Sequence, residues 1–315
     1  MLTIVSTIPL SEQDRARIRA AAPDFTLVEV PRGDQAQRLA VAPTADIWYG
    51  GGVDPSVLRA ARRLQWIQLA TAGVDRYLYP ELQAAPVRIT NVRGLHKDTI
   101  AEHVILMMLA LARRLPEFFQ QQAAARWHKL ELSEIAGDTV GIVGLGSIGQ
   151  EVARRARAFR LRVIGTRFSG APVDVADQTF GPDGLEQVLR QARWVVLACP
   201  LTERTHRMIG AEQLDWIGPN GYLINIGRGE LIDEPALISA LQEGRIAGAG
   251  LDVFATEPLP AESPLWRLPN VVITPHVAGS LRDYIGRATE VFCENLRRFR
   301  AGQPLHNEVD KLRGY

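Results

Sequence analysis

A glycine-rich turn at residues 144–149 constrains the fold of this chain more than any other feature. The apolar run Thr139-Val140-Gly141-Ile142-Val143 leads straight into Gly144-Leu145-Gly146-Ser147-Ile148-Gly149, and a helical pattern follows. In this strand, turn and helix pattern, the first glycine permits the turn, the second lets the backbone approach a pyrophosphate, and the third lets helix and strand pack closely. Free amides and the dipole at the helix start favour the phosphate charge. The pattern predicts dinucleotide binding, and a purely structural turn is the alternative.

The length of the chain predicts two domains. Its 315 residues exceed what one core usually holds, and a large region precedes the glycine turn. The net charge of +1 gives no electrostatic case for nucleic acid or an anionic membrane as partner. Cys199 and Cys293 lack metal-type spacing and fit a reducing compartment. With no signal-peptide pattern at residues 1–10 and no apolar run that could cross a bilayer, we expect a cytoplasmic protein without a bound metal.

Alternating apolar runs and helical patterns predict the α/β class, with a parallel sheet in each domain. In the first domain the expected strands are Leu2–Val5, Thr26–Val30, Asp46–Tyr49, Gln65–Leu69 and Val87–Thr90, with helices at Ser11–Ala21 and Pro55–Ala61. In the second domain they are Thr139–Val143, Leu161–Thr166, Trp194–Ala198, Gly221–Ile226, Ala247–Asp252 and Val271–Thr274, with helices at Ser147–Arg160, Gly184–Ala192 and Glu234–Glu243.

The final helical pattern, Ser280–Arg300, is long enough to return to the first domain. We therefore expect two doubly wound parallel-sheet domains. A Rossmann cofactor domain, residues 99–284, is inserted in a discontinuous flavodoxin-like substrate domain, residues 1–98 plus 285–315.

The segment Thr99–Phe119 is the longest apolar helical pattern of the first half. Thr99 and Glu102 have the spacing of a capping box. A helix that is apolar on most sides is buried, so we expect it to cross from the first domain to the second. The more polar segment Gln120–Gly137 is either a surface loop or a dimerisation arm.

Two glycine-bearing strand ends in the first domain are candidate substrate-binding turns. They are Tyr49–Gly52 and Ala70–Val74. Ligands of open α/β sheets bind outside the carboxyl ends of the strands. The backbone amides of Ala72 and Gly73 would then bind a substrate carboxylate, unless both segments are ordinary strand-to-helix turns.

Arg167 stands where a dinucleotide-binding domain usually carries an acidic residue, at the end of the second strand. The strand ends in Thr166-Arg167-Phe168-Ser169. A carboxylate there would accept hydrogen bonds from the ribose 2′-hydroxyl, whereas a guanidinium pairs with a 2′-phosphate. Thr166, Arg167 and Ser169 therefore predict NADPH in preference to NADH. The alternative is that Arg167 is a solvated surface charge.

Three polar residues follow successive apolar strands of the second domain: Arg228, Glu257 and His276. Strand ends of a parallel sheet gather at one edge, so we expect these side chains beside the nicotinamide. Reduction of a 2-oxo acid needs a cation for the carboxylate and carbonyl, an acid for the developing alkoxide, and a partner for that acid. Arg228, His276 and Glu257 fit these roles in that order, although each taken alone is as compatible with a structural role.

The chain resembles the D-isomer-specific 2-hydroxyacid dehydrogenase family along nearly its whole length. The blocks that carry the resemblance are Gly144–Gly149, Cys199-Pro200-Leu201-Thr202 with Thr205, Asn225–Asp233, Gly250–Phe254 with Glu257-Pro258, and Thr274-Pro275-His276. The resemblance implies a two-domain, homodimeric enzyme with its active site in the interdomain cleft and the three catalytic roles given above.

The resemblance also implies further cofactor and substrate contacts. Thr71-Ala72-Gly73-Val74 matches the carboxylate-binding loop, and Asp252 matches the position near the nicotinamide carboxamide. The remaining expected cofactor contacts are Thr99, Cys199, Pro200, Thr205, Ile226 and Gly227. NAD-preferring members carry Asp where this chain has Arg167, which agrees with NADPH as the preferred cofactor and NAD as the second.

Two other functions share this fold. One is a dinucleotide-sensing binding protein that resembles a corepressor, against which the set of Arg228, Glu257 and His276 argues. The other is a relative of formate dehydrogenase, a branch expected to pair its histidine with Gln where this chain has Glu257.

Overall fold

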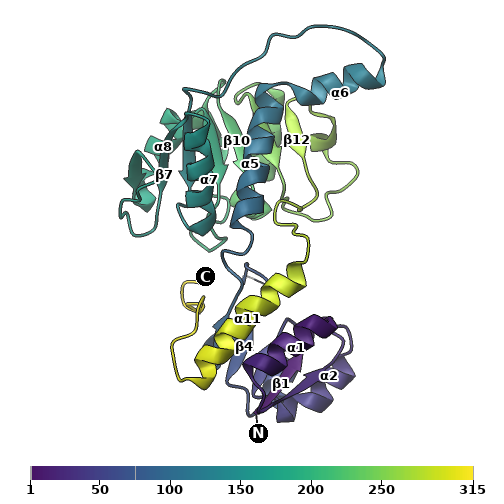
Figure 1. Cartoon of the computed structure of the whole chain (residues 1–315). Helices are drawn as coiled ribbons and strands as arrows, with labels where there is room; N and C mark the ends of the chain where they lie inside the picture. The colour runs from purple at the N-terminus through teal and green to yellow at the C-terminus, as the bar shows by residue number, and fades with distance from the viewer. Residues whose placement is uncertain (1, 75, 315) are drawn as a thin grey trace. The chain divides into compact units, whose positions relative to one another are not determined.

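The chain folds into two compact units, shown in Figure 1. A computed structural model describes residues 2–74 and 76–314. The discontinuous unit comprises Met1–Leu95 and Leu281–Tyr315, and the central unit comprises His96–Ser280. Met1, Asp75 and Tyr315 fall in the expected substrate domain and lie outside the described residues.

The sheet of the discontinuous unit has five parallel strands in the order β2-β1-β3-β4-β5. The strands are β1 (Leu2–Ser6), β2 (Phe25–Glu29), β3 (Ile47–Tyr49), β4 (Trp66–Gln68) and β5 (Arg88–Thr90). This is the flavodoxin-like order, in which the chain reverses direction across the sheet between β1 and β3. The predicted fold class of this unit is confirmed.

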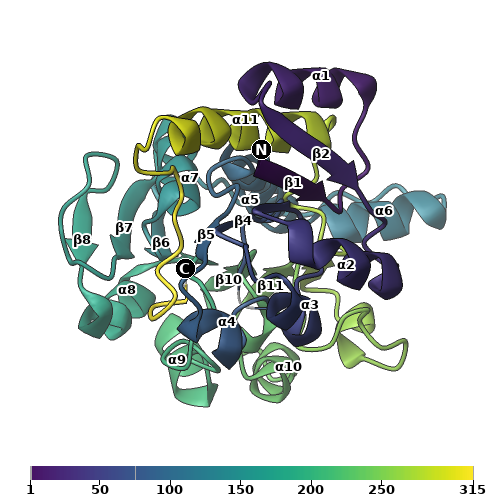
Figure 2. The ribbon, with the colours of Figure 1, turned by 90° about the horizontal axis from the view of Figure 1, so that it is seen from below.

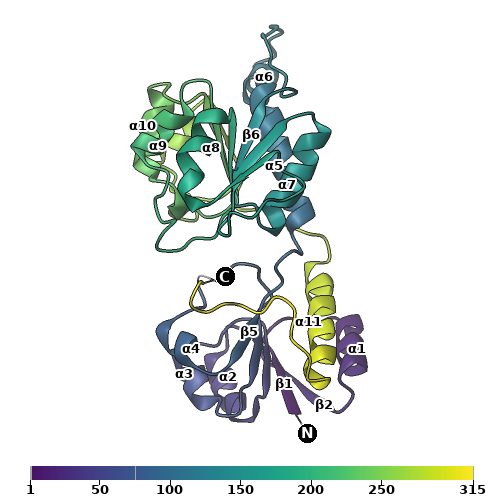
Figure 3. The same ribbon diagram turned by 90° about the vertical axis from the view of Figure 1, so that its left-hand side faces the viewer.

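Helices cover both faces of this sheet, as Figure 3 shows. On one face lie α1 (Glu12–Ala21) and α11 (Tyr284–Arg300), and on the other lie α2 (Gln35–Val41), α3 (Pro55–Ala60) and α4 (Pro80–Ala84). Successive strand residues enter opposite cores: Ile4 packs in the cluster that contains Phe292, whereas Val5 packs in the cluster that contains Val57. Both faces are apolar because both are covered, as expected for a parallel sheet.

The sheet of the central unit has seven parallel strands in the order β12-β11-β10-β9-β6-β7-β8. Its strands are β6 (Thr139–Val143), β7 (Arg162–Thr166), β8 (Gln178–Phe180), β9 (Trp194–Leu197), β10 (Tyr222–Asn225), β11 (Gly248–Leu251) and β12 (Val271–Ile273). The run of β8, β7 and β6 is visible in Figure 2. The order is that of a Rossmann fold, with its switch point between β6 and β9.

The helices of the central unit also form two layers. On one face α5 (Lys97–Ala112) packs against α7 (Ser147–Ala158), and on the other lie α8 (Leu185–Gln191), α9 (Ala211–Ile217) and α10 (Glu234–Gln242). Ile142 belongs to the first core cluster and its neighbour Val143 to the second. Because all seven strands are parallel, their carboxyl ends lie at the same edge of the sheet.

The prediction of one long helix at Thr99–Phe119 is wrong in three respects. The segment divides into α5 and α6 (Leu115–Ala123), because Arg114 is left-handed at φ 52° and Pro116 follows it in the first turn of α6. The capping box does not form: α5 begins at Lys97, and the Thr99 hydroxyl donates to the His96 carbonyl at 3.1 Å. The helix also lies inside the central unit and does not cross between units.

Several short elements were not predicted from the sequence. These are α2, α4, β8 and α9. The last helix, α11, begins at Tyr284, four residues later than expected. Residues 124–137 carry no helix or strand, and the Trp127 side chain there is 95% exposed. Among the described residues, no helix has both the length and the apolar character that crossing a membrane requires.

Candidate active site

The glycine turn has the geometry that binding a pyrophosphate requires. Gly144 has φ 106°, and a Cβ there would lie 2.7 Å from the Cys199 amide nitrogen across the switch point. A Cβ at Gly149 would overlap the Gly144 carbonyl oxygen, so the start of α7 packs on the strand end only because both residues are glycines. Gly146 is exposed and has no atom within 4 Å of a Cβ position.

The amino end of α7 is open to an anion. Gly146 is its N-cap, no side chain caps it, and its first turn contains no acidic residue. The first amides of a helix have no partner within the helix, so those of Ser147 and Ile148 remain for a ligand. The observed turn therefore fits a dinucleotide phosphate, by open space at Gly146 and by unused donors beside it.

Arg167 lies directly after β7, in a turn that continues to Gly170. The Arg167 amide donates to the Phe180 carbonyl of the neighbouring strand end at 2.9 Å, and the Thr166 carbonyl accepts from the Leu145 amide at 2.8 Å. These bonds fix Arg167 beside the glycine turn. Within residues 2–74 and 76–314, no acidic side chain pairs with its guanidinium. The Ser169 hydroxyl accepts from the Ala171 amide at 3.3 Å and keeps its own proton as a donor.

The loop after β9 has a preorganised shape. The Thr205 hydroxyl donates to the Pro200 carbonyl at 2.7 Å and accepts from the Thr202 amide at 2.8 Å, so it holds the loop closed. Burial raises the pKa of the Cys199 thiol to about 11. Cys199 is therefore a neutral side chain at neutral pH, next to Gly144, and adds no negative charge where a pyrophosphate would bind.

Arg228 follows β10 in a turn whose backbone is held by the buried side-chain amide of Asn225. The Asn225 side chain is fully buried, donates to the Arg228 carbonyl at 2.8 Å and accepts from the Gly227 amide at 3.1 Å. Ile226 within this turn is buried. A Cβ at Gly229 would overlap the Phe254 backbone, so this turn is in direct contact with the one that follows β11.

Glu257 and His276 are brought together by the two strands that follow. His276 Nδ1 lies 2.8 Å from Glu257 Oε2, and Glu257 Oε1 accepts from the Phe254 amide at 3.1 Å. The imidazole is 47% exposed, whereas the Glu257 side chain is 24% exposed. The carboxylate is thus fixed by the backbone and engages the Nδ1 edge of the ring, so Nε2 is the ring nitrogen that Glu257 does not bind.

Two residues that the sequence associates with the cofactor have their polar groups engaged within the protein. The Asp252 side chain is 2% exposed, and both its oxygens accept hydrogen bonds from the turn that carries His276. Thr99 lies in the first turn of α5, where its hydroxyl donates to the His96 carbonyl. The structure places both in the central unit with the glycine turn.

The turn at Ala72 and Gly73, in the discontinuous unit, has free donors. The Asn91 side chain donates to the Ala72 carbonyl at 2.8 Å, and the Thr71 hydroxyl donates to the Gly73 carbonyl at 2.9 Å. In the part of the chain that the structure describes, the Ala72 and Gly73 amides donate to no protein acceptor. Fixed carbonyls and free amides give this turn the capacity to bind a carboxylate.

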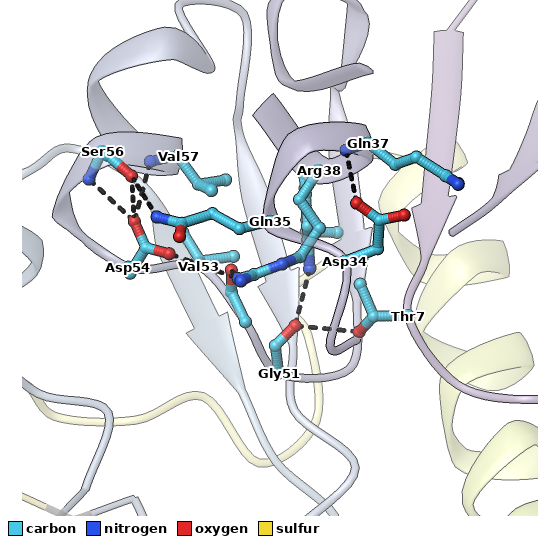
Figure 4. A network of polar contacts seen from close by, with 12 residues as sticks. Thr7, Asp34, Gln35, Gln37, Arg38, Gly51, Val53, Asp54, Ser56 and Val57 are labelled. Carbon is cyan, nitrogen blue, oxygen red and sulfur yellow. Dashed lines mark hydrogen bonds and ion pairs between the residues drawn. The ribbon is translucent and has the colours of Figure 1, made fainter. Parts of the chain in front are cut away.

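The second glycine-bearing turn of this unit, Gly50–Gly52, is held by a network of side chains, shown in Figure 4. The Thr7 hydroxyl donates to the Gly51 carbonyl at 2.8 Å. Arg38, which is 9% exposed, donates to the Gly52 carbonyl and lies 3.3 Å from Asp54 Oδ2. The Arg38 side chain thus packs against the Gly52 end of this turn.

Two polar residues near His276 were missed from the sequence: His103 on α5 and Thr274 at the end of β12. His103 Nε2 lies 2.9 Å from Thr274 Oγ1. The available signal was a histidine interrupting the apolar pattern between Ala101 and Val104.

Among the described residues, no group of three or more His, Cys, Asp or Glu side chains is arranged to hold a metal ion.

Comparison with known proteins identifies the family of this chain. The family model described as "D-isomer specific 2-hydroxyacid dehydrogenase, NAD binding domain" matches residues 105–278. The glyoxylate reductase of Korarchaeum cryptofilum is 35% identical over 82% of this chain and 80% of its own length.

Solved structures of full length are also similar. A D-isomer-specific 2-hydroxyacid dehydrogenase family protein from Aeromonas salmonicida is 33% identical with a TM-score of 0.84, over 98% of this chain and 99% of that one. The NADPH-dependent glyoxylate/hydroxypyruvate reductase of Sinorhizobium meliloti, solved with NADP and sulfate, is 28% identical with a TM-score of 0.87, over 100% of both chains. This chain therefore belongs to the D-isomer-specific 2-hydroxyacid dehydrogenase family and is an NAD(P)-dependent oxidoreductase of that family.

Proposed function

We propose that this enzyme reduces a small 2-oxo acid to the D-2-hydroxy acid, with NADPH as its preferred cofactor. The observation that carries the proposal is the pair of His276 Nδ1 and Glu257 Oε2 at 2.8 Å, on the same strand edge as Arg228 and the open glycine turn. A histidine hydrogen-bonded to a carboxylate at the carboxyl edge of a Rossmann sheet is suited to proton transfer coupled to a dinucleotide reaction.

The roles of the three residues follow from their hydrogen bonds. Glu257 accepts from Nδ1–H of His276 and so fixes the ring, and Nε2–H of the imidazole is the acid that protonates the developing alkoxide. Arg228 binds the substrate carboxylate and polarises the carbonyl. When bound, the reduced nicotinamide supplies the hydride to the carbonyl carbon.

The NADPH preference rests on Arg167. Its backbone is fixed beside the glycine turn, and no acidic side chain of the described residues neutralises it. A guanidinium there pairs with a 2′-phosphate and offers no acceptor to a 2′-hydroxyl. The Sinorhizobium meliloti relative, an NADPH-dependent reductase solved with NADP, is consistent with this choice. Arg167→Asp is expected to shift the ratio of specificity constants toward NADH, and an unchanged ratio would locate the 2′-phosphate site elsewhere.

Glyoxylate and hydroxypyruvate are the proposed first substrates. The relatives named as glyoxylate reductase and glyoxylate/hydroxypyruvate reductase support this choice. The test is a panel of 2-oxo acids, including pyruvate and larger apolar acids, assayed with NADPH and NADH and ranked by kcat/KM. Cofactor binding without turnover of any acid in the panel would overturn the enzymatic proposal and favour a dinucleotide-sensing protein.

His276→Ala tests the assignment of the acid. Loss of a positioned general acid typically lowers kcat by ~10²–10⁴-fold. The NADPH dissociation constant is expected to stay near that of the wild type, because His276 is not part of the glycine turn. A variant that reduces the best substrate at the wild-type rate would show that another residue donates the proton.

We also propose a cytoplasmic homodimer. Phe119, at 63% exposure, and Trp127, at 95%, are large apolar side chains in and after α6 that the described residues leave exposed. A second copy that buries them would make residues 115–137 an arm between subunits. Light scattering of the wild type and of Trp127→Asp is the test, and a wild-type monomer at micromolar concentration would exclude the arm.

A further inference from the structure

The turn that carries His276 has a backbone conformation that must be held in place. His276 has φ 53°, and its amide donates to the Asp252 carbonyl at 2.8 Å. A left-handed conformation costs a residue with a Cβ about 1–2 kcal/mol, so it persists only where the surroundings enforce it. The direction in which the imidazole points depends on that enforcement.

The Asp252 carboxylate supplies the enforcement on both sides of His276. Oδ1 accepts from the Thr274 hydroxyl at 2.6 Å and from the Val277 amide at 2.9 Å, and Oδ2 accepts from the Ala278 amide at 2.9 Å. Buried carboxylates persist where several donors compensate the charge, and bonds to a charged acceptor are the stronger ones. The turn is therefore clamped to the end of β11 by one buried anion.

His103 reaches this clamp from a different layer of the unit. Its side chain is 13% exposed on α5, and Nε2 lies 2.9 Å from Thr274 Oγ1 and 3.8 Å from Asp252 Oδ1. A threonine hydroxyl has one proton, and an ionised carboxylate can only accept. The Thr274 proton therefore goes to Asp252, and His103 must donate Nε2–H to Thr274. The result is one directed chain: His103 to Thr274 to Asp252.

We propose that His103 and Thr274 are positioning residues for His276: they orient the Asp252 carboxylate, which in turn fixes the left-handed turn on which the catalytic imidazole sits. This inference rests on the proposed function, because it takes His276 as the acid. It gives α5 a part in the reaction, although none of its side chains is assigned to touch the substrate. Glu257 fixes the imidazole ring of His276, and the hydrogen bonds from His103 through Thr274 to Asp252 fix the backbone of the turn that carries it.

Paired variants separate positioning from mere stability. Thr274→Val removes the hydroxyl at constant shape, whereas Thr274→Ser keeps it. His103→Leu removes the donor, whereas His103→Gln keeps an N–H near the same place. Measured quantities are kcat and KM for the best 2-oxo acid, the NADPH dissociation constant, and the midpoint of thermal unfolding.

The expected result is a split between kcat and the binding constants. Misplacement of a catalytic group by about 1 Å costs up to ~10²-fold, so Thr274→Val and His103→Leu should lower kcat by ~10–100-fold. KM and the NADPH dissociation constant should remain within about threefold, and Thr274→Ser and His103→Gln should retain most of kcat. Because the two residues act in one chain, the double variant should lose little more than either single variant.

Amide hydrogen exchange gives a readout that does not need turnover. Val277 and Ala278 amides should exchange faster in Thr274→Val than in Thr274→Ser, at equal global stability. If the wild type reduces no 2-oxo acid, the proposed function fails. Amide exchange still decides whether the hydrogen bonds from His103 through Thr274 to Asp252 hold the turn. Wild-type kcat in Thr274→Val and His103→Leu, or unchanged exchange of both amides, would overturn the proposal. If the Thr274 variant does not fold, the His103 variant takes its place in the comparison, and the reverse.

Discussion

The two units carry glycine turns of similar composition at their switch points, and only one of them is open. In the central unit the turn at 144–149 has an exposed Gly146 with empty space around it. In the discontinuous unit the turn at 50–52 is filled: the Arg32 guanidinium would lie 3.2 Å from a Cβ at Gly51, and Arg38 Nη1 2.9 Å from one at Gly52. Glycine thus leaves open space at Gly146 and makes room for side chains of the protein at Gly51 and Gly52.

The helices that follow the two turns differ in the same way. The start of α3 is capped by Asp54, whose Oδ1 accepts from the Ser56 amide at 2.9 Å and from the Val57 amide at 3.1 Å. The start of α7 has no side-chain cap. A carboxylate cap engages two of the first amides and places a negative charge at the helix start, which disfavours a phosphate there. The state of the cap is therefore more informative about ligand binding than the number of glycines.

The largest effect is expected from Gly149→Ala. The new Cβ would overlap the Gly144 carbonyl, which is backbone and cannot move aside, so α7 must shift away from β6. Overpacking of this kind costs about 3 kcal/mol in the free energy of unfolding. NADPH binding should be lost as well. Urea unfolding and cofactor titration are the measurements, and Gly181→Ala, a site with nothing within 4 Å, is the matched control.

Gly146→Ala should separate binding from stability. The site has no neighbour within 4 Å and its φ is −84°, so the folded protein accommodates alanine without strain. The methyl group would occupy the space that a pyrophosphate needs, which should raise the NADPH dissociation constant ~10–100-fold, or ~1.4–2.8 kcal/mol. The thermal midpoint should not change. An unchanged dissociation constant would mean that the phosphates bind elsewhere.

Gly52→Ala should have the opposite outcome. Gly52 has φ 86°, and a Cβ there crowds Arg38, so alanine should lower the free energy of unfolding by roughly 1–2 kcal/mol. The NADPH dissociation constant should be unaffected, since no role in cofactor binding is assigned to the discontinuous unit. Gly33→Ala, with nothing within 4 Å, serves as the control in the same unit. Weaker NADPH binding in Gly52→Ala alone would remove the distinction between the two turns.

Asp54→Ala should give the smallest effect, the loss of an N-cap worth about 0.5–2 kcal/mol. Burial alone would raise the Asp54 pKa, but bonds from the Ser56 hydroxyl and the Val57 and Ser56 amides, together with Arg38, lower it below 3.8. A lowered folded pKa stabilises the protein above the unfolded pKa, and this contribution disappears as pH falls through the folded value. The stability difference between wild type and Asp54→Asn should therefore shrink below about pH 4.

Much of the central unit could be predicted because its signals are local. The alternation of buried residues such as Ile142 and Val143 marks a strand with both faces covered, and Gly-x-Gly-x-x-Gly marks its end. Arg228, Glu257 and His276 could be placed at one edge because each follows a recognisable strand. Their roles in catalysis and the preference for NADPH stay predictions, which the variants above address.

The rest could not be predicted because it depends on contacts between distant segments. The bond from His103 to Thr274 joins residues 171 positions apart. The bond from Arg38 to the Gly52 carbonyl depends on the packing of α2 against the sheet. At seven residues, α2 is too short to show a clear helical period in the sequence. The break at Arg114 did have a local signal, the proline at position 116, which the apolar pattern of α5 concealed.

The discontinuity of the first unit has a consequence for biosynthesis. Phe292 of α11 stacks on Tyr49 at 4.1 Å between ring centroids, and Thr289 lies 3.0 Å from the Tyr49 hydroxyl. Residues 96–280 are translated between the two halves of that unit, while the central unit has its whole sheet within them. At about 5–20 residues per second, the ribosome takes ~10–40 s over that interval. For that time Tyr49 of β3 and Trp66 of β4 are without the cover that Phe292 of α11 provides in the folded unit.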